Sequence, residues 1–184
     1  MARTESGTRM QKGDIAPDFS LQGVDGKIHS LENLISGKQG ILILFICNHC
    51  PYVKARTTEM VGIYDAFKDS IAVVAINSSD PEYPGEGIDN MKAFARERGF
   101  TFPYLIDESG SVAKAYGATC TPDPFLFDAG LQLIFHGRLT DALEPQDAST
   151  EFTMRDNIEK LLKNEPIDPW FNPSLGCSIK FKAA

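Results

Sequence analysis

The stretch that decides the fold is ILILFICNHCPYVKARTTEM, residues 41–60. Its first six residues, Ile41 to Ile46, are all apolar and leave no polar face, which is typical of a strand buried on both sides of a sheet. After a polar turn, apolar side chains recur at helical spacing at Val53, Met60, Ile63, Tyr64 and Phe67. The stretch therefore predicts a buried strand, a tight turn and an amphipathic helix that runs to about residue 69.

Two cysteines, Cys47 and Cys50, lie where this strand must stop and the helix begins. If the helix starts just after Cys47, Pro51 falls in its first turn, where the missing N–H has no intrahelical partner to lose. Cys47 then lies at the helix N-terminus, where free N–H groups and the helix dipole stabilise a thiolate. We therefore expect Cys47 to be the more exposed and more acidic thiol. A C-x-x-C pair at such a junction indicates thiol–disulfide redox chemistry.

Length and charge limit the class of protein. With 184 residues, the chain can form one domain with a full core. The net charge of −7 argues against a nucleic-acid-binding surface. No apolar window is long enough to span a bilayer, and residues 1–20 lack the apolar core of a secretory signal. We therefore expect a cytoplasmic protein without a membrane partner, in which cysteines are more often catalytic or metal-binding than structural.

The rest of the chain alternates apolar runs with helical patterns. We expect a flexible lead-in over 1–13, a β-hairpin near 19–28, a buried strand over 71–76, a polar loop over 77–89, a helix over 88–99, a strand over 104–106 and a short helix over 112–116. An antiparallel hairpin of strands 125–127 and 131–135 and a helix over 151–163 follow. The order predicts one α/β domain over 14–163, with a central mixed sheet flanked by helices, an N-terminal β-hairpin and a C-terminal extension, 164–184, that packs on the domain. The loop 77–89 either borders the active site or is a surface insertion.

Several motifs resemble the thioredoxin-like superfamily. They are Ala16-Pro17-Asp18-Phe19, the apolar strand that leads into Cys47-x-x-Cys50, Thr121-Pro122 before the last two strands, the CNHCPYV run over 47–53 and the GCSIK run over 176–180. Over about residues 14–163, the chain is similar to the peroxiredoxin-like thioredoxins related to the AhpC/TSA group. The resemblance implies a thioredoxin-like fold, Pro122 as a cis-proline that faces the redox cysteines, and Thr121 as a residue that presents its backbone to a bound polypeptide. Proline is the residue at which a cis bond costs little.

The chain departs from both parent groups. True peroxiredoxins carry Pro-x-x-x-Thr-x-x-Cys around the peroxidatic cysteine. When that cysteine is aligned with Cys50, Cys47 stands at the threonine position and Ile43 at the proline position. The threonine that helps to activate peroxide is therefore missing. Thioredoxin has Trp-Cys-Gly-Pro-Cys, whereas here Ile46 replaces the tryptophan and Asn48-His49 replaces Gly-Pro.

The proposed chemistry needs two thiols. The Cys47 thiolate attacks a disulfide sulfur, and Cys50, one helical turn later, resolves the mixed disulfide. The alternative is a zinc half-site or a pair of inert core thiols, although one C-x-x-C without a second pair is a poor structural zinc site. His49 lies between the two cysteines. As an imidazolium it would stabilise a thiolate and make the disulfide more oxidising; the alternative is a solvent-facing histidine without effect.

Two further cysteines and two further histidines have open roles. Cys120 precedes Thr121-Pro122 and is either a third redox thiol or a small buried residue. Cys177 lies in the tail and is either a packed thiol or a distal resolving cysteine. His29 and His136 are expected to be structural.

Three functions remain in competition. The first is thiol–disulfide exchange at Cys47 and Cys50 with protein or small disulfides, supplied with electrons by a thioredoxin or glutathione system. The second is antioxidant peroxide reduction with Cys50 as the peroxidatic thiol and Cys47 or Cys177 as the resolving thiol. The third is a non-catalytic metal-binding or chaperone-like module that uses the cysteines with His49. For the first, we expect no cofactor and no metal, in a monomer or homodimer.

Overall fold

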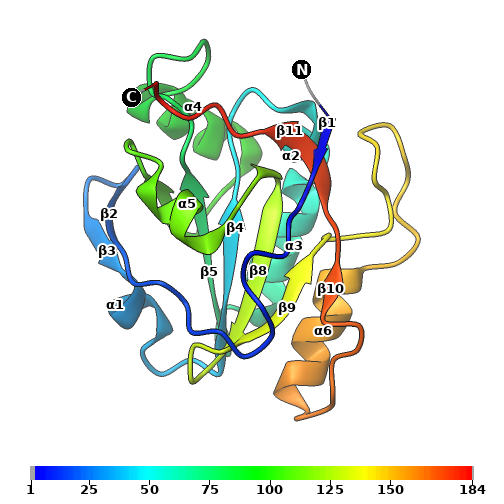
Figure 1. Cartoon of the computed structure of the whole chain (residues 1–184). Coiled ribbons are helices and arrows are strands. Elements are labelled where there is room, and N and C mark those ends of the chain that lie inside the picture. Colours follow the sequence, from blue (N-terminus) through cyan, green and yellow to red (C-terminus); the bar gives the residue numbers. More distant parts are fainter. Residues whose placement is uncertain (1–2, 184) are drawn as a thin grey trace.

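The structure is a computed structural model that describes residues 3–183 (Figure 1). Strands and helices alternate through the middle of the chain, over residues 40–116, as the sequence pattern predicts. They are β1 (Arg3–Glu5), β2 (Ser20–Gly23), β3 (Ile28–Ser30), α1 (Leu31–Ile35), β4 (Gly40–Phe45), α2 (Pro51–Lys54), α3 (Thr57–Phe67), β5 (Ile71–Asn77), α4 (Ile88–Arg98), β6 (Tyr104–Ile106), α5 (Ser111–Tyr116), β7 (Cys120–Thr121), β8 (Asp123–Asp128), β9 (Leu133–Gly137), α6 (Thr153–Leu162), β10 (Phe171–Asn172) and β11 (Leu175–Ser178).

The main sheet has the strand order β10-β9-β8-β4-β5-β6-β2-β3. The two apolar runs of the sequence, β4 and β5, pair in parallel at its centre, and β6 continues the parallel set. On the other side of β4, β8 runs antiparallel to it, and β9 forms a hairpin with β8. The short hairpin of β2 and β3 closes the far edge. The predicted mixed sheet with helices and an N-terminal hairpin is therefore confirmed.

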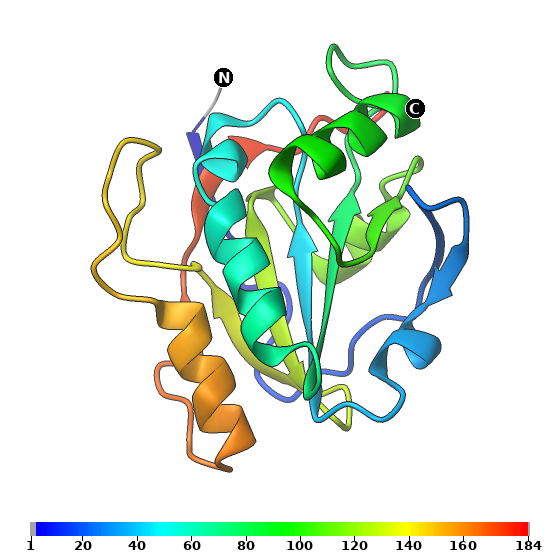
Figure 2. The ribbon, with the colours of Figure 1, turned by 180° about the vertical axis from the view of Figure 1, so that it is seen from behind.

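The apolar run of β4 serves two cores, one on each face of the sheet. Leu42, Leu44 and Ile46 face a core completed by α2, α3, α4 and α6. Ile41, Ile43 and Phe45 face a second core, completed by α1 and α5. Figure 2 shows α3, α4 and α6 lying across the first face. Successive strand residues point to opposite faces, so a strand covered on both sides must be apolar at every position.

The helix after the cysteines is broken, where the sequence predicts one helix to about residue 69. It divides into α2 and α3 at Ala55–Arg56, and Arg56 is the residue that caps α3. The Arg56 side chain is buried, and its guanidinium donates hydrogen bonds to the carbonyl oxygens of Ala142 and Glu144. These contacts tie the break to a distant loop, which local helix periodicity does not encode.

Both ends of the described chain join a second, three-stranded sheet in the order β1-β11-β7. The sequence predicts a flexible lead-in over 1–13, but residues 3–5 form β1, which pairs antiparallel with β11 (Figure 1). The tail pairs with the domain at two places: β10 runs parallel to β9, and β11 runs antiparallel to β7. The three-stranded sheet lies at the end of the molecule where β4 ends and the two cysteines follow it.

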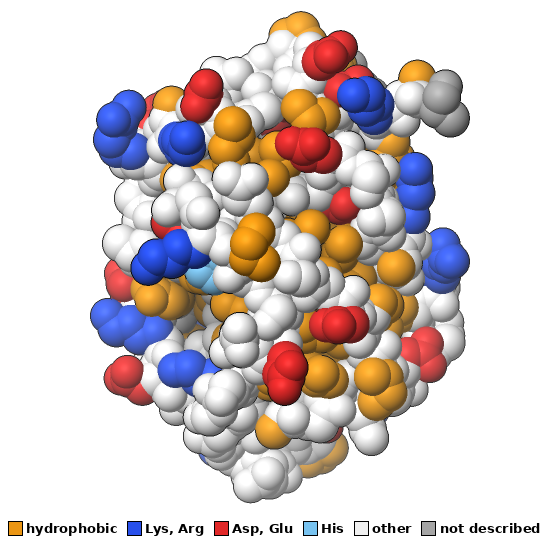
Figure 3. Space-filling model, turned by 90° about the vertical axis from the view of Figure 1, so that its left-hand side faces the viewer, with side chains coloured by type: hydrophobic (Ala, Val, Ile, Leu, Met, Phe, Trp, Pro, Cys, Tyr) orange, Lys and Arg blue, Asp and Glu red, His pale blue; other side chains and the backbone are white. Residues whose placement is uncertain are grey.

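The face of the molecule in Figure 3 is mixed in charge. On the face in Figure 3, acidic and basic side chains are interspersed among hydrophobic ones, and no field of basic side chains gathers there. Across residues 3–183, no helix combines the length and the apolar character needed to cross a bilayer.

Candidate active site

The strand-to-helix turn places the two cysteines differently from the expectation. β4 ends at Phe45, the chain turns through residues 46–49, and α2 begins at Pro51 with Cys50 as its N-cap. Pro51 is thus in the first turn, as predicted, but the helix starts one step after Cys50 rather than just after Cys47. Both cysteines are buried, with 1% of Cys47 and 0% of Cys50 exposed, so Cys47 is not the distinctly exposed thiol that the sequence predicts.

The residue before Pro122 contacts both sulfurs. The Thr121–Pro122 peptide bond is cis. Cys50 Sγ lies 3.1 Å from the carbonyl oxygen of Thr121, to which it can donate when it is protonated, and Cys47 Sγ lies 3.2 Å from Thr121 Oγ1. The centre of the site is therefore the two cysteines with Thr121, whose backbone contacts Cys50 and whose side chain contacts Cys47.

The acidity of the two thiols is opposite to the expectation. The hydrogen bond from the Cys47 thiol lowers the pKa of Cys50 to about 5, and the backbone N–H of Val53 in the first turn of α2 lowers it further. The same hydrogen bond to Cys50, together with burial, raises the pKa of Cys47. The main cause is the Cys47 thiol, and the helix start adds to it because a free N–H of the first turn faces the N-cap sulfur, which is Cys50. The pair therefore carries its negative charge on Cys50.

His49 connects Cys47 to a buried carboxylate. Its Nδ1 lies 2.5 Å from Glu86 Oε1, and its Nε2 lies 3.9 Å from Cys47 Sγ. A carboxylate accepts hydrogen bonds, so Nδ1 carries the proton and Nε2 is directed at the thiol. Cys47, His49 and Glu86 thus form a chain of the thiol–imidazole–carboxylate kind, in which the carboxylate orients the ring.

Glu86 was missed by the sequence reasoning. Its side chain is fully buried and accepts hydrogen bonds from the backbone N–H groups of Asn48 and His49 and from Asn77 Nδ2. Tyr104 extends this network, since its hydroxyl donates to Asn48 Oδ1. The loop 77–89 therefore contacts the cysteine turn directly. The available signal was its position: the loop follows β5, the parallel neighbour of β4, so both leave the sheet at the same edge.

The same chain of residues has the spacing of a metal site. The ligand atoms of Cys47, His49 and Glu86 all lie within 4.8 Å of one another. However, Glu86 Oε1 already accepts from two backbone N–H groups and from the imidazole. A cation would have to compete with these donors, so the arrangement suits hydrogen bonding better than metal coordination.

The remaining singled-out residues lie at various distances from this centre. Cys120 is fully buried, its thiol faces the carbonyl oxygen of Pro122, and burial raises its pKa, which favours the packing role. Cys177 lies on β11 in the same core cluster as Cys47 and Cys50. His136 is buried against Asp123, with 2.7 Å between Nε2 and Oδ1, and His29 pairs with Asp25 on the surface hairpin.

Comparison with known proteins agrees with this architecture. The chain is 32% identical over 124 residues to the thiol-disulfide oxidoreductase ResA of Geobacillus thermodenitrificans (strain NG80-2), and the match covers 66% of each protein, so the chain spans about two thirds of that relative's length. A crystal structure of an uncharacterized conserved protein from Geobacillus kaustophilus has a TM-score of 0.93 and 40% identity, and the match covers 100% of this chain and 98% of that one.

A more distant structure shows the fold alone. The thioredoxin domain of a thiol-disulfide oxidoreductase from Bacteroides vulgatus has a TM-score of 0.64 at 17% identity, and the match covers 82% of this chain and 97% of that one. The model of the AhpC/TSA family matches residues 12–135, which is more than half of the chain. With its thioredoxin-like fold and this match, the chain belongs to the AhpC/TSA family.

Proposed function

We propose that this protein is a thiol–disulfide oxidoreductase whose redox pair is Cys47 and Cys50 and whose substrates are protein disulfides. The observation that carries the proposal is the meeting of the two cysteines at Thr121, Cys50 at its carbonyl oxygen and Cys47 at its hydroxyl, with one sulfur acidic and the other beside an oriented imidazole. The similarity to a protein named thiol-disulfide oxidoreductase ResA supports the same chemistry.

The order of attack in this proposal follows the acidity. The Cys50 thiolate attacks one sulfur of the substrate disulfide, which forms a mixed disulfide and releases the first substrate thiolate. This assignment reverses the one drawn from the sequence, in which Cys47 attacks first. The reason is that Cys50 holds the negative charge and lies against the backbone of Thr121, where a polypeptide would dock.

Cys47 completes the reaction. Its thiol gives a proton to His49 Nε2 and attacks Cys50 Sγ, so that the Cys47–Cys50 disulfide forms and the second substrate thiol leaves. The two cysteine sulfurs give two electrons to the substrate. One substrate sulfur receives the Cys47 proton by way of His49, and the thiolate released first takes its proton from solvent. A thioredoxin or glutathione system would return the protein to its dithiol form.

The test is reduction of insulin disulfides with dithiothreitol as the electron source. We expect catalysis above the dithiothreitol background, no stoichiometric metal in the active protein, and slow consumption of hydrogen peroxide. Protein that carries bound zinc and does not accelerate insulin reduction would support the metal-binding alternative.

One observation favours a second function, peroxide reduction. Cys50, which aligns with the peroxidatic cysteine of the family, is the thiol whose pKa is lowered, to about 5. In that reaction Cys50 would become a sulfenic acid, and Cys47 would condense with it to release water. Peroxide turnover that exceeds insulin reduction would assign the protein to this second function.

The imidazole and the carboxylate should shift the reduction potential in opposite directions. Negative charge on Glu86 opposes negative charge on the thiol pair, whereas His49 accepts a proton from it. We expect Glu86→Gln to favour the reduced state and make the potential more positive, and His49→Gln to make it more negative. A tenfold change in the equilibrium is about 30 mV for this two-electron couple, which a glutathione titration resolves.

Burial of Glu86 calls for a stability control. Gln at position 86 can still accept from the two backbone N–H groups, but its amide would oppose Asn77 Nδ2. Thermal unfolding of both variants shows whether the site remains folded at the temperature of the titration. Shifts of the same sign in two folded variants would contradict opposed roles for Glu86 and His49.

A further inference from the structure

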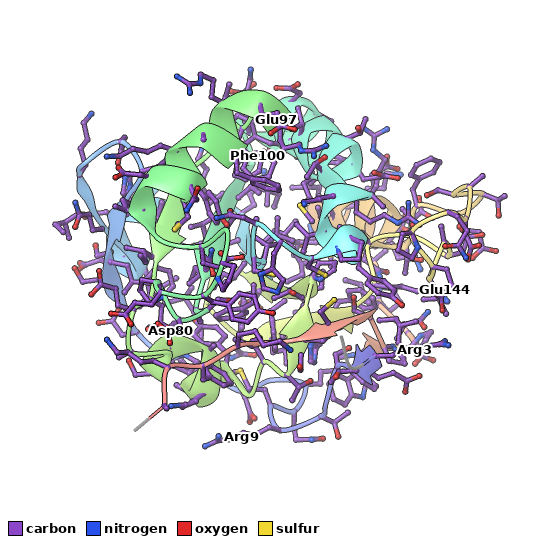
Figure 4. All side chains as sticks on the ribbon, turned by 90° about the horizontal axis from the view of Figure 1, so that it is seen from above. Arg3, Arg9, Asp80, Glu97, Phe100 and Glu144 are labelled. Carbon is purple, nitrogen blue, oxygen red and sulfur yellow. The ribbon has the colours of Figure 1, made fainter. Side chains whose placement is uncertain are left out.

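The edge of β7 beside Cys50, where a substrate strand would bind, is occupied by a strand of the protein's own tail. In the proposed function, a substrate polypeptide aligns with the backbone of Thr121 on β7. In the structure, β11 lies there as an antiparallel strand, with Cys177 opposite Thr121 and Ser178 opposite Cys120. Figure 4, which views this end from above, shows β11 crossing the molecule between β1 and the rest of the domain. A strand of the tail therefore takes the place that a substrate strand would need.

Close contacts fix the position of β11 against β7. A Cβ at Gly176 would lie 2.0 Å from the carbonyl oxygen of Thr121, so that no other residue fits without moving the strand. Beyond β11, the Ser174 hydroxyl donates to the Pro122 carbonyl at 2.7 Å, and the Asp80 N–H donates to the Lys180 carbonyl at 2.6 Å. The tail is thus held before and after the strand, and the glycine permits the close approach between them.

β1 covers the outer side of β11. Thr4 pairs with Gly176, and Arg3 forms an ion pair with Glu144 at 3.2 Å, visible at the edge of Figure 4. This ion pair is largely exposed on the arginine side, so it contributes little to stability. β11 therefore has a partner strand on each edge. The outer partner, β1, has only three residues, so it is easily displaced.

Cys177 brings a third sulfur to the redox pair. The Cys177 thiol and its N–H both face the Cys50 sulfur. Burial raises the pKa of Cys177 to about 12, and the neighbouring Cys50 raises it as well. When Cys50 enters a disulfide it loses its charge, so this second influence on Cys177 disappears. Cys177 is therefore held as a proton-bearing thiol in the reduced protein and becomes easier to ionise in the oxidised one.

We propose that β11 is an internal substrate strand and that Cys177 is a third redox residue, which exchanges with the Cys47–Cys50 disulfide. This inference rests on the proposed function. In the step, Cys177 loses its proton and its sulfur attacks Cys50 Sγ. The Cys50–Cys177 bond forms, the Cys47–Cys50 bond breaks, and Cys47 leaves as a thiolate that takes up the proton. The number of disulfides does not change, so the step needs no further oxidant.

A functional consequence concerns substrate size. While β11 is paired with β7, a polypeptide disulfide can bind only after β11 has moved away. The apparent affinity of the protein for a polypeptide substrate is therefore limited by the fraction of molecules in which β11 has left β7. A small disulfide such as oxidised glutathione needs no strand pairing. The tail therefore selects between polypeptide and small substrates.

The first test maps disulfides in the oxidised wild-type protein. The full chain is oxidised with excess oxidised glutathione, quenched with acid, digested and read by mass spectrometry. We expect peptides joined through Cys50–Cys177 alongside Cys47–Cys50, and Cys177→Ser should retain Cys47–Cys50 alone. Oxidised protein that contains Cys47–Cys50 without any Cys50–Cys177 overturns this inference but leaves the proposed function intact. Protein that forms neither disulfide overturns both.

The second test displaces the strand. Gly176→Ala should lower the apparent KM for insulin disulfides by roughly tenfold, change the KM for oxidised glutathione much less, and remove the Cys50–Cys177 peptide. The matched control is Gly62→Ala in α3, where an added Cβ has nothing within 4 Å. An unchanged KM in a folded Gly176→Ala protein contradicts the role of β11. If that variant does not fold, the disulfide map of the wild-type protein still decides.

Discussion

Cys50→Ser should reduce the rate of insulin-disulfide reduction by roughly 10³-fold or more, because no other group replaces a nucleophile that forms the covalent intermediate. The hydroxyl can still donate to the Thr121 carbonyl, so the fold should persist. The measurement is the initial rate under dithiothreitol, with circular dichroism to verify folding. Activity within tenfold of wild type would remove Cys50 from the first step.

Two neighbouring cysteines serve as controls for that variant. Cys47→Ser should keep the first attack and accumulate a mixed disulfide between Cys50 and the substrate, which mass spectrometry detects. Cys120→Ser should leave the rate near that of wild type, since a serine hydroxyl can donate to the same Pro122 carbonyl. A mixed disulfide that is trapped in Cys50→Ser instead of Cys47→Ser would restore the opposite order of attack.

The assignment of Cys50 as the acidic thiol predicts how its rate of alkylation depends on pH. With its pKa lowered to about 5, Cys50 stays ionised as the pH falls from 8 to 6, so its labelling by iodoacetamide should remain nearly constant there and fall near pH 5. Cys47, whose pKa is raised, should label slowly throughout. Because the two thiols share a hydrogen bond, the apparent values belong to the pair. A rate of Cys50 labelling that already decreases as the pH is lowered from 9 to 8 would contradict a stabilised thiolate.

The second large effect concerns stability rather than rate. His136→Phe should lower the free energy of unfolding by about 3–5 kcal/mol, because it removes the side-chain partner of the buried Asp123 carboxylate and leaves it only backbone N–H donors. Phenylalanine keeps the apolar contact, since the His136 ring stacks on Phe125 at 3.8 Å between centroids. At about 2–4 °C per kcal/mol for a chain of this size, the melting temperature should fall by roughly 6–20 °C.

A surface pair provides the matched control. His29→Phe breaks another histidine–aspartate pair, with Asp25, but in a solvent-accessible hairpin, so it should cost less than about 1 kcal/mol. Equal effects of the two substitutions would show that burial of Asp123 does not govern the loss.

The loss in His136→Phe should also depend on pH. Burial raises the pKa of Asp123, while His136 lowers it, so removing the histidine raises it further. A folded state that binds the proton more tightly than the unfolded state loses stability as the pH rises above the unfolded value of about 3.9. We therefore expect the variant to be less impaired at pH 4 than at pH 7. Chemical unfolding at both values measures the difference.

The sheet was predictable because its signal is local. The apolar runs over 41–46 and 71–76 lack a polar face, and such runs form the two central strands β4 and β5. The break between α2 and α3 was not predictable in the same way. It depends on Arg56, whose guanidinium donates to carbonyl oxygens in the loop around Glu144, far along the chain. Helix periodicity contains no information about such a partner.

The candidate site also has features that the sequence predicts and features that depend on distant contacts. The residue types at Cys47, Cys50 and Thr121-Pro122 are visible in the sequence, as is a proline that starts the helix. The acidity of Cys50 depends on the direction of the hydrogen bond between the two thiols and on the residue at which the helix begins, and sequence patterns determine neither. Glu86 lies in a polar loop like many others, and its burial follows from four donor groups that converge on it in space.

The most direct test of the central claim is a redox titration of the wild-type protein in glutathione buffers, with each sample acid-quenched and its cysteines assigned by mass spectrometry. The account predicts a two-electron transition, between about −180 and −270 mV, in which Cys50 loses its thiol together with Cys47 or, after exchange within the protein, with Cys177. Folded protein that keeps both thiols in excess oxidised glutathione would contradict it.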